Sequence, residues 1–124
     1  MKAVLDTNIL IDFLMGSGAA RDELKKYRQP MVSIITWMEI LVGATHSGPP
    51  DEATLRAFLK TFKVLTLTET IAEGAVALRR QRRIRLPDAI IWATAIDSEC
   101  LLVTRNTRDF SADHPNVRVP YVTP

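Results

Sequence analysis

The sequence predicts an α/β domain in three layers, with a central parallel sheet of four to five strands flanked by helices. Short apolar runs alternate along the chain with segments whose apolar residues recur at helical spacing, which is the pattern of a parallel sheet covered on both faces. The 124 residues, 47% of them hydrophobic and 24% charged, have the size and composition of one globular unit. We therefore expect residues 1–124 to form a single domain.

The first half of the chain opens on a strand and an acidic turn. An apolar run at 2–5 precedes Asp6, and the apolar residues within 9–14 then follow helical spacing. The other elements predicted in this half are a helix, a strand and a helix, over 19–27, 31–35 and 36–45. For the last of these helices, Thr36 followed by Glu39 three residues later has the pattern of a capping box, which predicts Thr36 as the N-cap.

The second half begins with the clearest helical spacing, at 51–62, where four apolar residues recur at i, i+3, i+4 and i+7. Thr70 and Glu73 form another capping-box pattern, which predicts a helix that runs into a cluster of arginines. A last helix, over 89–97, is apolar on nearly every face, so we expect it to be buried. The strands predicted in this half lie at 64–67, 100–104 and 117–122.

Composition argues against several classes of protein. No apolar run approaches the roughly 20 residues that cross a bilayer. Asp6 and Asp12 interrupt the apolar region that a signal peptide requires. Cys100 is the only cysteine, which excludes an internal disulfide and suits a reducing compartment. We therefore expect a soluble, cytoplasmic protein with no membrane partner.

Basic residues are clustered although the net charge is only +2. Five of the 16 Lys and Arg residues fall within seven positions, as Arg79, Arg80, Arg82, Arg83 and Arg85. Such a patch can hold phosphates even on a nearly neutral chain. An arginine-rich helix end is equally well explained by the helix dipole, which favours cations there.

Acidic and polar residues follow three of the predicted strands. Asp6 comes directly after the first strand, and Glu39 about one turn into the helix after the second. Asp109 lies in the loop after the strand at 100–104, together with Thr104 and Asn106. Because ligands of parallel sheets bind beyond the carboxyl ends of the strands, we expect these residues to converge at one edge of the sheet.

Each acid alone has a structural explanation, such as a helix cap or a turn. Glu39 and Asp88, however, lie in apolar segments, where a carboxylate is costly to bury unless it is paired or holds a cation. Four acids gathered together repel one another, and a divalent cation removes that conflict. Oxygen ligands suit Mg²⁺ or Mn²⁺, whereas His46 and His114 lack zinc-motif spacing. Such ions most often serve phosphate chemistry.

Four segments carry a resemblance to a known family: VLDTNILID at 4–12, SIITWMEI at 33–40, LPDAIIWATA at 86–95 and LVTRNTRDF at 102–110. In this order and at these gaps they resemble a PIN-domain ribonuclease, and specifically a VapC-type toxin of a bacterial or archaeal toxin–antitoxin pair. The resemblance spans nearly the whole chain.

The resemblance implies a PIN-like three-layer fold and a metal-dependent endoribonuclease that uses Mg²⁺ or Mn²⁺ and often cuts tRNA or rRNA. The residues that match the family's acidic quartet, as catalytic residues and metal ligands, are Asp6, Glu39, Asp88 and Asp109. Those that match its supporting polar positions are Thr7, Asn8, Thr104 and Asn106. The resemblance also implies a VapB-type antitoxin as partner and a homodimer. The arginine cluster then becomes a candidate contact for the RNA backbone.

Other interpretations fit parts of the sequence. A PIN fold can be a non-catalytic module that binds RNA or protein, although retention of all four acids favours catalysis. A haloacid-dehalogenase-type phosphatase needs a second Asp where Asn8 stands and a late lysine, and no lysine follows Lys63. The metal chemistry alone does not distinguish RNA from DNA, because attack by water requires no 2′-OH. Trp37 and Trp92 could stack on bases, but their aliphatic neighbours favour the core or a dimer interface.

Overall fold

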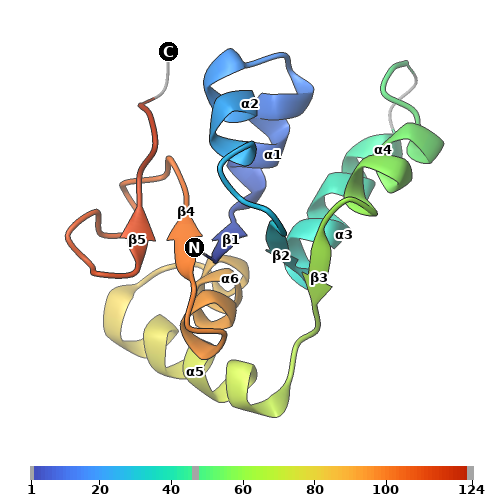
Figure 1. The fold of residues 1–124 in the computed structure, drawn as a ribbon. Helices are drawn as coiled ribbons and strands as arrows, with labels where there is room; N and C mark the ends of the chain where they lie inside the picture. Colours follow the sequence, from blue (N-terminus) through green and yellow to red (C-terminus); the bar gives the residue numbers. More distant parts are fainter. Residues whose placement is uncertain (1, 46–47, 123–124) are drawn as a thin grey trace.

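The computed structural model of the chain describes residues 2–45 and 48–122, so that positions 1, 46–47 and 123–124 of the expected domain, His46 included, lie outside the described residues. Its strands form one parallel sheet in the order β3-β2-β1-β4-β5 (Figure 1). The strands are β1 (Ala3–Leu5), β2 (Met31–Ser33), β3 (Lys63–Leu65), β4 (Leu101–Val103) and β5 (Val117–Arg118). The predicted parallel sheet is confirmed, although the strand expected over 117–122 is limited to its first two residues.

The helices of the described part are α1 (Thr7–Leu14), α2 (Gly18–Leu24), α3 (Ile34–Val42), α4 (Glu52–Leu59), α5 (Glu69–Arg82), α6 (Leu86–Asp97) and the short 3-10 helix η1 (Gly43–Thr45). Two helices have an N-cap other than the predicted one, and α6 begins at Leu86 rather than at 89. Ser33, rather than Thr36, caps α3, because its hydroxyl accepts a hydrogen bond from the Ile35 backbone N–H at 3.0 Å. Thr68, rather than Thr70, caps α5 in the same way.

Side chains alternate between the two faces of the sheet and create two hydrophobic layers. Val4 and Leu102 point to the face covered by α5 and α6. Leu5 and Val103 point to the face covered by α1, α3 and α4. Figure 1 shows α5 and α6 below the strands and α1 and α2 above them. The three-layer fold is therefore confirmed, and α6 is buried along most of its length, as predicted.

The order of the strands places a crevice beside β1. The chain passes from β1 to β2 and β3 on one side, and α5 and α6 then return it to β4 on the other side. Such a reversal of strand order opens a crevice at the carboxyl ends of the strands, which is where open α/β sheets bind ligands. Among residues 2–45 and 48–122, no helix is both long enough and apolar enough to cross a membrane.

Candidate active site

Asp6 lies at this crevice, directly after β1, and only 4% of its surface is exposed. Its Oδ1 atom accepts a hydrogen bond from the backbone N–H of Thr7 at 2.8 Å, so it is also the N-cap of α1. Its Oδ2 atom accepts from the hydroxyl of Thr104 at 2.7 Å and from the side-chain amide of Asn8 at 3.2 Å. The capping role and a place in the site therefore coexist in one side chain.

The surroundings of Asp6 make its ionised form less favourable than that of a free carboxylate. Burial raises the pKa of Asp6 to about 6, although hydrogen bonds from Thr104 and Thr7 act in the opposite direction. The charges of Asp88 and Glu39 raise that pKa further. Asp6 is therefore close enough to the carboxylates of Asp88 and Glu39 to be repelled by them, and the sequence predicted that these acids converge.

Glu39 lies on α3 and contacts Thr7 at the crevice, and Thr7 in turn contacts Thr36. The Thr7 hydroxyl lies 2.7 Å from Glu39 Oε1 and 2.9 Å from the hydroxyl of Thr36. A hydroxyl has one proton and the carboxylate accepts, so Thr7 donates to Glu39 and Thr36 donates to Thr7. Thr36, which is fully buried, therefore supports Glu39 from inside the core rather than capping the helix.

Asp88 enters the crevice from the first turn of α6 and is 7% exposed. Burial raises its pKa, the adjacent Arg85 lowers it, and the charges of Asp109 and Glu39 raise it. Arg85 Nε lies 3.4 Å from Asp88 Oδ2, and the Arg85 side chain is 76% exposed. Asp88 therefore joins the other acids, although the strand-end rule alone does not place it there.

Asp109 lies in the loop after β4 and contacts the pocket-lining residue Asn106 rather than the other acids. Its Oδ2 atom accepts a hydrogen bond from the side-chain amide of Asn106 at 2.9 Å. The backbone N–H of Asn106 in turn donates to the Thr104 hydroxyl at 3.0 Å, and that hydroxyl donates to Asp6. The loop thus connects Asp109 to Asp6 through the side chain and backbone N–H of Asn106 and the hydroxyl of Thr104, two residues that the sequence had indicated as support for the site.

A pocket of about 290 Å³ brings these residues together. It is lined by Asp6, Thr7, Asn8, Ile11, Glu39, Arg85, Asp88 and Asn106. Three acids of the predicted quartet therefore share one pocket, whereas Asp109 stands behind Asn106. Thr104 is fully buried beneath it.

The donor set fits a divalent cation chemically. As the side chains stand, no three His, Cys, Asp or Glu residues within 2–45 and 48–122 are gathered closely enough to hold a metal ion. All the acids at the pocket nevertheless offer oxygen ligands, which hard cations such as Mg²⁺ prefer. The pKa values of Asp6 and Asp88 are each raised by neighbouring carboxylates, and a cation relieves that repulsion.

The five arginines of the cluster have different neighbours in the structure. All five arginines are exposed, but within the cluster only Arg85 lines the pocket. The Arg82 guanidinium carbon lies 4.9 Å from the centre of the Trp92 ring, and Arg83 ends α5 in a left-handed conformation with φ of 52°.

Trp92 is fully buried, so the suggestion that it stacks on bases is wrong and the prediction of a core position is correct. Trp37 packs partly buried against the other core layer.

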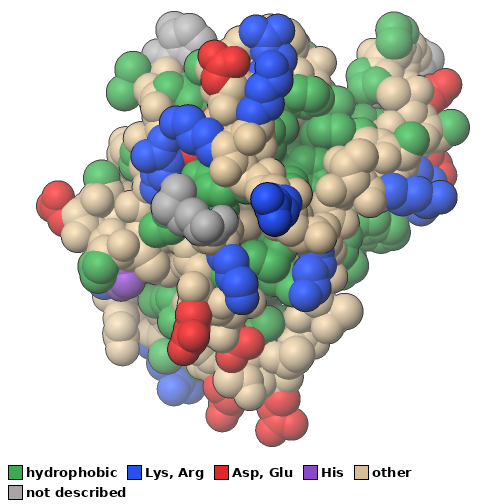
Figure 2. Space-filling view, in the orientation of Figure 1, with side chains coloured by type: hydrophobic (Ala, Val, Ile, Leu, Met, Phe, Trp, Pro, Cys, Tyr) green, Lys and Arg blue, Asp and Glu red, His purple; other side chains and the backbone are tan. Residues whose placement is uncertain are grey.

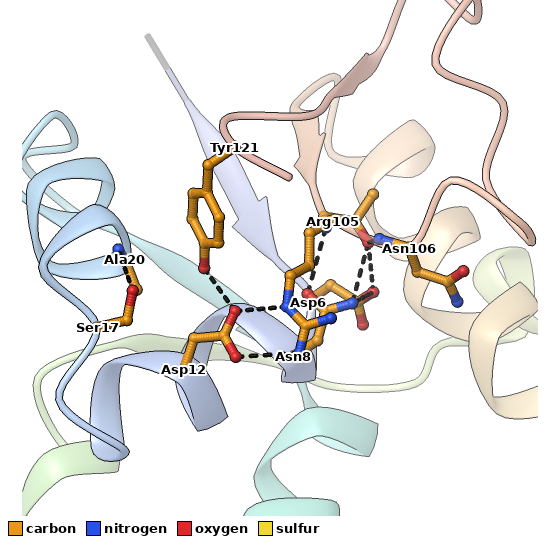
Figure 3. Close-up of polar contacts among 9 residues, drawn as sticks. Asp6, Asn8, Asp12, Ser17, Ala20, Arg105, Asn106 and Tyr121 are labelled. Atoms are coloured by element: carbon orange, nitrogen blue, oxygen red, sulfur yellow. Dashed lines mark hydrogen bonds and ion pairs between the residues drawn. The ribbon is translucent and has the colours of Figure 1, made fainter. Parts of the chain in front are cut away.

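Sequence reasoning missed two features beside the pocket. Thr36 was assigned to a cap, although its position three residues before Glu39 also places it near that side chain. A second group, formed by Asp12, Arg105 and Tyr121, adjoins Asn8 (Figure 3). The four-residue spacing of Asn8 and Asp12, which places both on one face of α1, was an available signal.

The fold is a three-layer α/β domain with an acidic pocket at the carboxyl ends of its strands, and residues 3–113 match the PIN domain family. The chain belongs to this family. No curated protein matches the sequence significantly.

Solved structures extend the match over nearly the whole chain. A chain of a toxin–antitoxin complex from Klebsiella pneumoniae is 43% identical, with a TM-score of 0.91 over 98% of this chain and 100% of that one. A chain of DNA-bound VapBC from Salmonella typhimurium is 25% identical, with a TM-score of 0.81 over 95% and 96%. A chain of FitAcB from Neisseria gonorrhoeae, at 23% identity and a TM-score of 0.81 over 95% and 97%, shows the shared fold. The resemblance to VapC-type PIN domains is confirmed.

Proposed function

We propose that the chain is a metal-dependent endoribonuclease that acts as the toxin of a toxin–antitoxin pair and hydrolyses phosphodiester bonds in tRNA or rRNA. The observation that carries this proposal is the pocket in which Asp6, Glu39 and Asp88 meet from three separate elements. The family and the 43% identical chain from a toxin–antitoxin complex support the same function.

We assign the metal to Asp6, Asp88 and Asp109, with Glu39 as a further ligand or as the carboxylate that orients the attacking water. One or two Mg²⁺ ions, or Mn²⁺ in their place, supply an activated water and stabilise charge on the leaving oxygen. Thr104, Thr7 and Asn8 hold the Asp6 carboxylate, and Thr7 also holds Glu39. Because water attacks rather than the 2′-OH, the products should carry a 5′-phosphate and a 3′-OH.

The arginine cluster is the proposed contact for the RNA backbone. Arg85 lies at the pocket, where it can bind a phosphate next to the bond that is cut. The other four arginines extend this exposed positive surface along the end of α5. Contacts of this kind position the strand without reading its sequence.

The proposed antitoxin fits an apolar groove of about 510 Å³ between α1, α2 and α4. Figure 2 shows hydrophobic side chains exposed between α2 and α4. The lining includes Phe13, Leu24 and Phe58, with Arg21 and Lys25 at its margin. An antitoxin helix with an apolar face and acidic flanks matches this surface. We further propose a cytoplasmic homodimer.

The test is cleavage of total tRNA and rRNA by the purified chain with Mg²⁺ or Mn²⁺, in parallel with EDTA. Asp6→Asn is the informative variant, because asparagine preserves the N-cap of α1 and removes the charge. Asp97→Asn, an exposed acid at the far end of α6, is the matched control. We expect a discrete cut that Asp6→Asn and EDTA abolish and Asp97→Asn retains.

Two outcomes would contradict the proposal. Products that end in a 2′,3′-cyclic phosphate would mean that the 2′-OH, not water, is the nucleophile. Absence of cleavage by folded, antitoxin-free protein at any concentration, together with no binding of Mn²⁺ in calorimetry, would favour the non-catalytic binding module.

A further inference from the structure

Three side chains outside the acidic pocket connect distant parts of the chain. Asp12 lies on α1, Arg105 in the loop after β4, and Tyr121 in the segment after β5 (Figure 3). Arg105 donates through Nε and Nη2 to the two carboxylate oxygens of Asp12, at 2.5 and 3.0 Å. The Tyr121 hydroxyl donates to Asp12 Oδ2 at 2.8 Å. A two-pronged pair of this kind fixes the orientation of the guanidinium as well as its distance.

This group reaches the pocket through Asn8, one helical turn before Asp12 on α1. The Asn8 side-chain oxygen accepts from the backbone N–H of Arg105 at 3.4 Å. The Asn8 amide nitrogen donates to Asp6 at 3.2 Å and lies 3.3 Å from the Thr104 hydroxyl. Arg105 is therefore held against α1 twice, by its backbone and by its side chain. It lies between Thr104, which bonds Asp6, and Asn106, which bonds Asp109.

We propose that Asp12, Arg105 and Tyr121 form a positioning network that sets the loop at 104–109, with Asn106 and Asp109, against Asp6. None of the three is proposed to touch metal or RNA. They act through the loop, so that the distance between Asp6 and Asp109 depends on contacts made one turn further along α1 and in the segment after β5. The consequence for metal binding rests on the proposed function, whereas the placement of the loop does not.

The charge state of Asp12 supports this arrangement. Burial alone would raise the pKa of Asp12, but hydrogen bonds from Arg105 and Tyr121 lower it below its ordinary value. The Asp12 side chain is 16% exposed and that of Arg105 is 26% exposed, so the pair is shielded from most of the solvent. A charged, shielded pair holds its geometry better than an ion pair at an open surface.

The chain contains a second group of the same chemistry that serves as a control. The Tyr27 hydroxyl donates to Glu23 at 2.6 Å, and Arg118 donates to the same carboxylate at 2.7 and 3.0 Å. This group joins α2 to β5, and none of its three residues lines the acidic pocket. The group meets the loop at one backbone bond, from the Thr104 N–H to the Arg118 carbonyl at 3.0 Å. Tyr27 is two contacts away from that bond, through Glu23 and Arg118, so removing its hydroxyl tests the loss of a similar bond at a greater distance from Asn106 and Asp109.

The experiment compares the full chain with Tyr121→Phe, Asp12→Asn and the control Tyr27→Phe. Amide hydrogen exchange at Arg105 and backbone NMR shifts at Asn106 and Asp109 report the position of the loop without metal or RNA. Calorimetric titration with Mn²⁺ reports the site. We expect Tyr121→Phe and Asp12→Asn to speed exchange at Arg105, to shift Asn106 and Asp109, and to weaken Mn²⁺ binding about tenfold, as lost outer-shell contacts do. Tyr27→Phe should lower the melting temperature by a similar amount. It should leave exchange at Arg105, the shifts at Asn106 and Asp109, and Mn²⁺ binding unchanged.

The outcomes separate this inference from the proposed function. If Tyr121→Phe shifts only Asp12 and Arg105 and leaves Asn106, Asp109 and Mn²⁺ binding unchanged, the positioning network is overturned. It is equally overturned if Tyr27→Phe alters the loop as strongly. If the unmodified chain binds no Mn²⁺, the metal-dependent function fails, and the shifts at Asn106 and Asp109 still decide whether the network places the loop. Tyr121→Phe retains the ring, so it is informative even if Asp12→Asn does not fold.

Discussion

Thr36 illustrates how a buried hydroxyl can shape a candidate active site without entering it. It is fully buried, and its hydroxyl donates to Thr7, which donates to Glu39. Thr36→Val keeps the shape of the side chain and removes the donor, so the Thr7 hydroxyl is free to rotate away from Glu39. We expect kcat to fall about tenfold with KM unchanged, the size of effect seen when outer contacts of a site are lost, as measured by single-turnover cleavage.

The matched control is Thr94→Val. Thr94 is equally buried on a helix, but its hydroxyl donates only to the Ile90 carbonyl of that helix, at 2.7 Å. Both variants should lose about 1 kcal/mol of stability, the usual net value of one hydrogen bond. Equal kinetic losses in the two variants would show that Thr36 contributes stability alone.

The acids were predictable residue by residue, whereas their partners were not. Asp6, Glu39 and Asp109 could be assigned because each follows a strand, and the carboxyl ends of parallel strands share one edge. The contacts from Thr7 to Glu39 and from Tyr121 to Asp12 join positions 32 and 109 residues apart in the sequence. No local pattern encodes such a pair, because it depends on how helices pack after the sheet has formed.

At the scale of elements, the presence of a helix was easier to predict than the residue at which it begins. The S/T-x-x-E pattern occurs at Thr36 and Glu39, yet Ser33 lies one turn earlier at the end of β2 and makes the cap. The same happens at Thr68 and Thr70 before α5. When several hydroxyls precede a helix, the backbone conformation at the strand end selects among them, and a sequence pattern does not contain that information.

Glu23 fixes α2 to β5 and should dominate the acid sensitivity of this part of the fold. Its side chain is 2% exposed and is held by Arg118 and Tyr27. Burial would raise the pKa of Glu23, but hydrogen bonds from Arg118, Tyr27 and Lys26 lower it to about 2. A lowered pKa means that the folded state binds this proton less tightly than the unfolded chain. The contribution of Glu23 is therefore complete above pH 4.5, its ordinary value, and is lost as the pH falls towards 2.

Glu23→Gln should accordingly lower the free energy of unfolding by about 2–3 kcal/mol at pH 7 and by little at pH 2, as measured by urea denaturation. Glu52→Gln is the control, because Glu52 pairs with Arg56 on the surface of α4, with 62% of its side chain exposed. That change should cost less than about 0.5 kcal/mol at either pH. A loss in Glu23→Gln that does not depend on pH would mean that packing, not charge, accounts for it.

At the scale of the whole molecule, the class of fold followed from the alternation of strands and helices, but the order of the strands did not. The sequence alone does not reveal that α5 and α6 return the chain across β1 to form β4. That crossing creates the crevice, and it also brings Asp88 on α6 next to Asp6. Asp88 was therefore the acid whose place depended most on the resemblance to a family and least on local reasoning.

The proposed homodimer makes a prediction about the face formed by α3 and the start of α6, which pack against each other. Glu39 and Asp88 lie on these two helices, and the same helices carry the exposed apolar side chains of Met38 (43%) and Leu86 (49%). A two-fold pairing through this face would cover both apolar side chains and bring two acidic pockets to one groove.

Met38→Glu places like charges on both sides of such an axis, so it should convert the dimer to a monomer at micromolar concentration. Multi-angle light scattering should then give 13.9 kDa for the variant and about twice that mass for the unmodified chain. Leu67→Glu, at an equally exposed side chain between β3 and α5, should leave the dimer intact. A monomeric unmodified chain would contradict the homodimer, and a dimer that survives Met38→Glu would place its interface on another face.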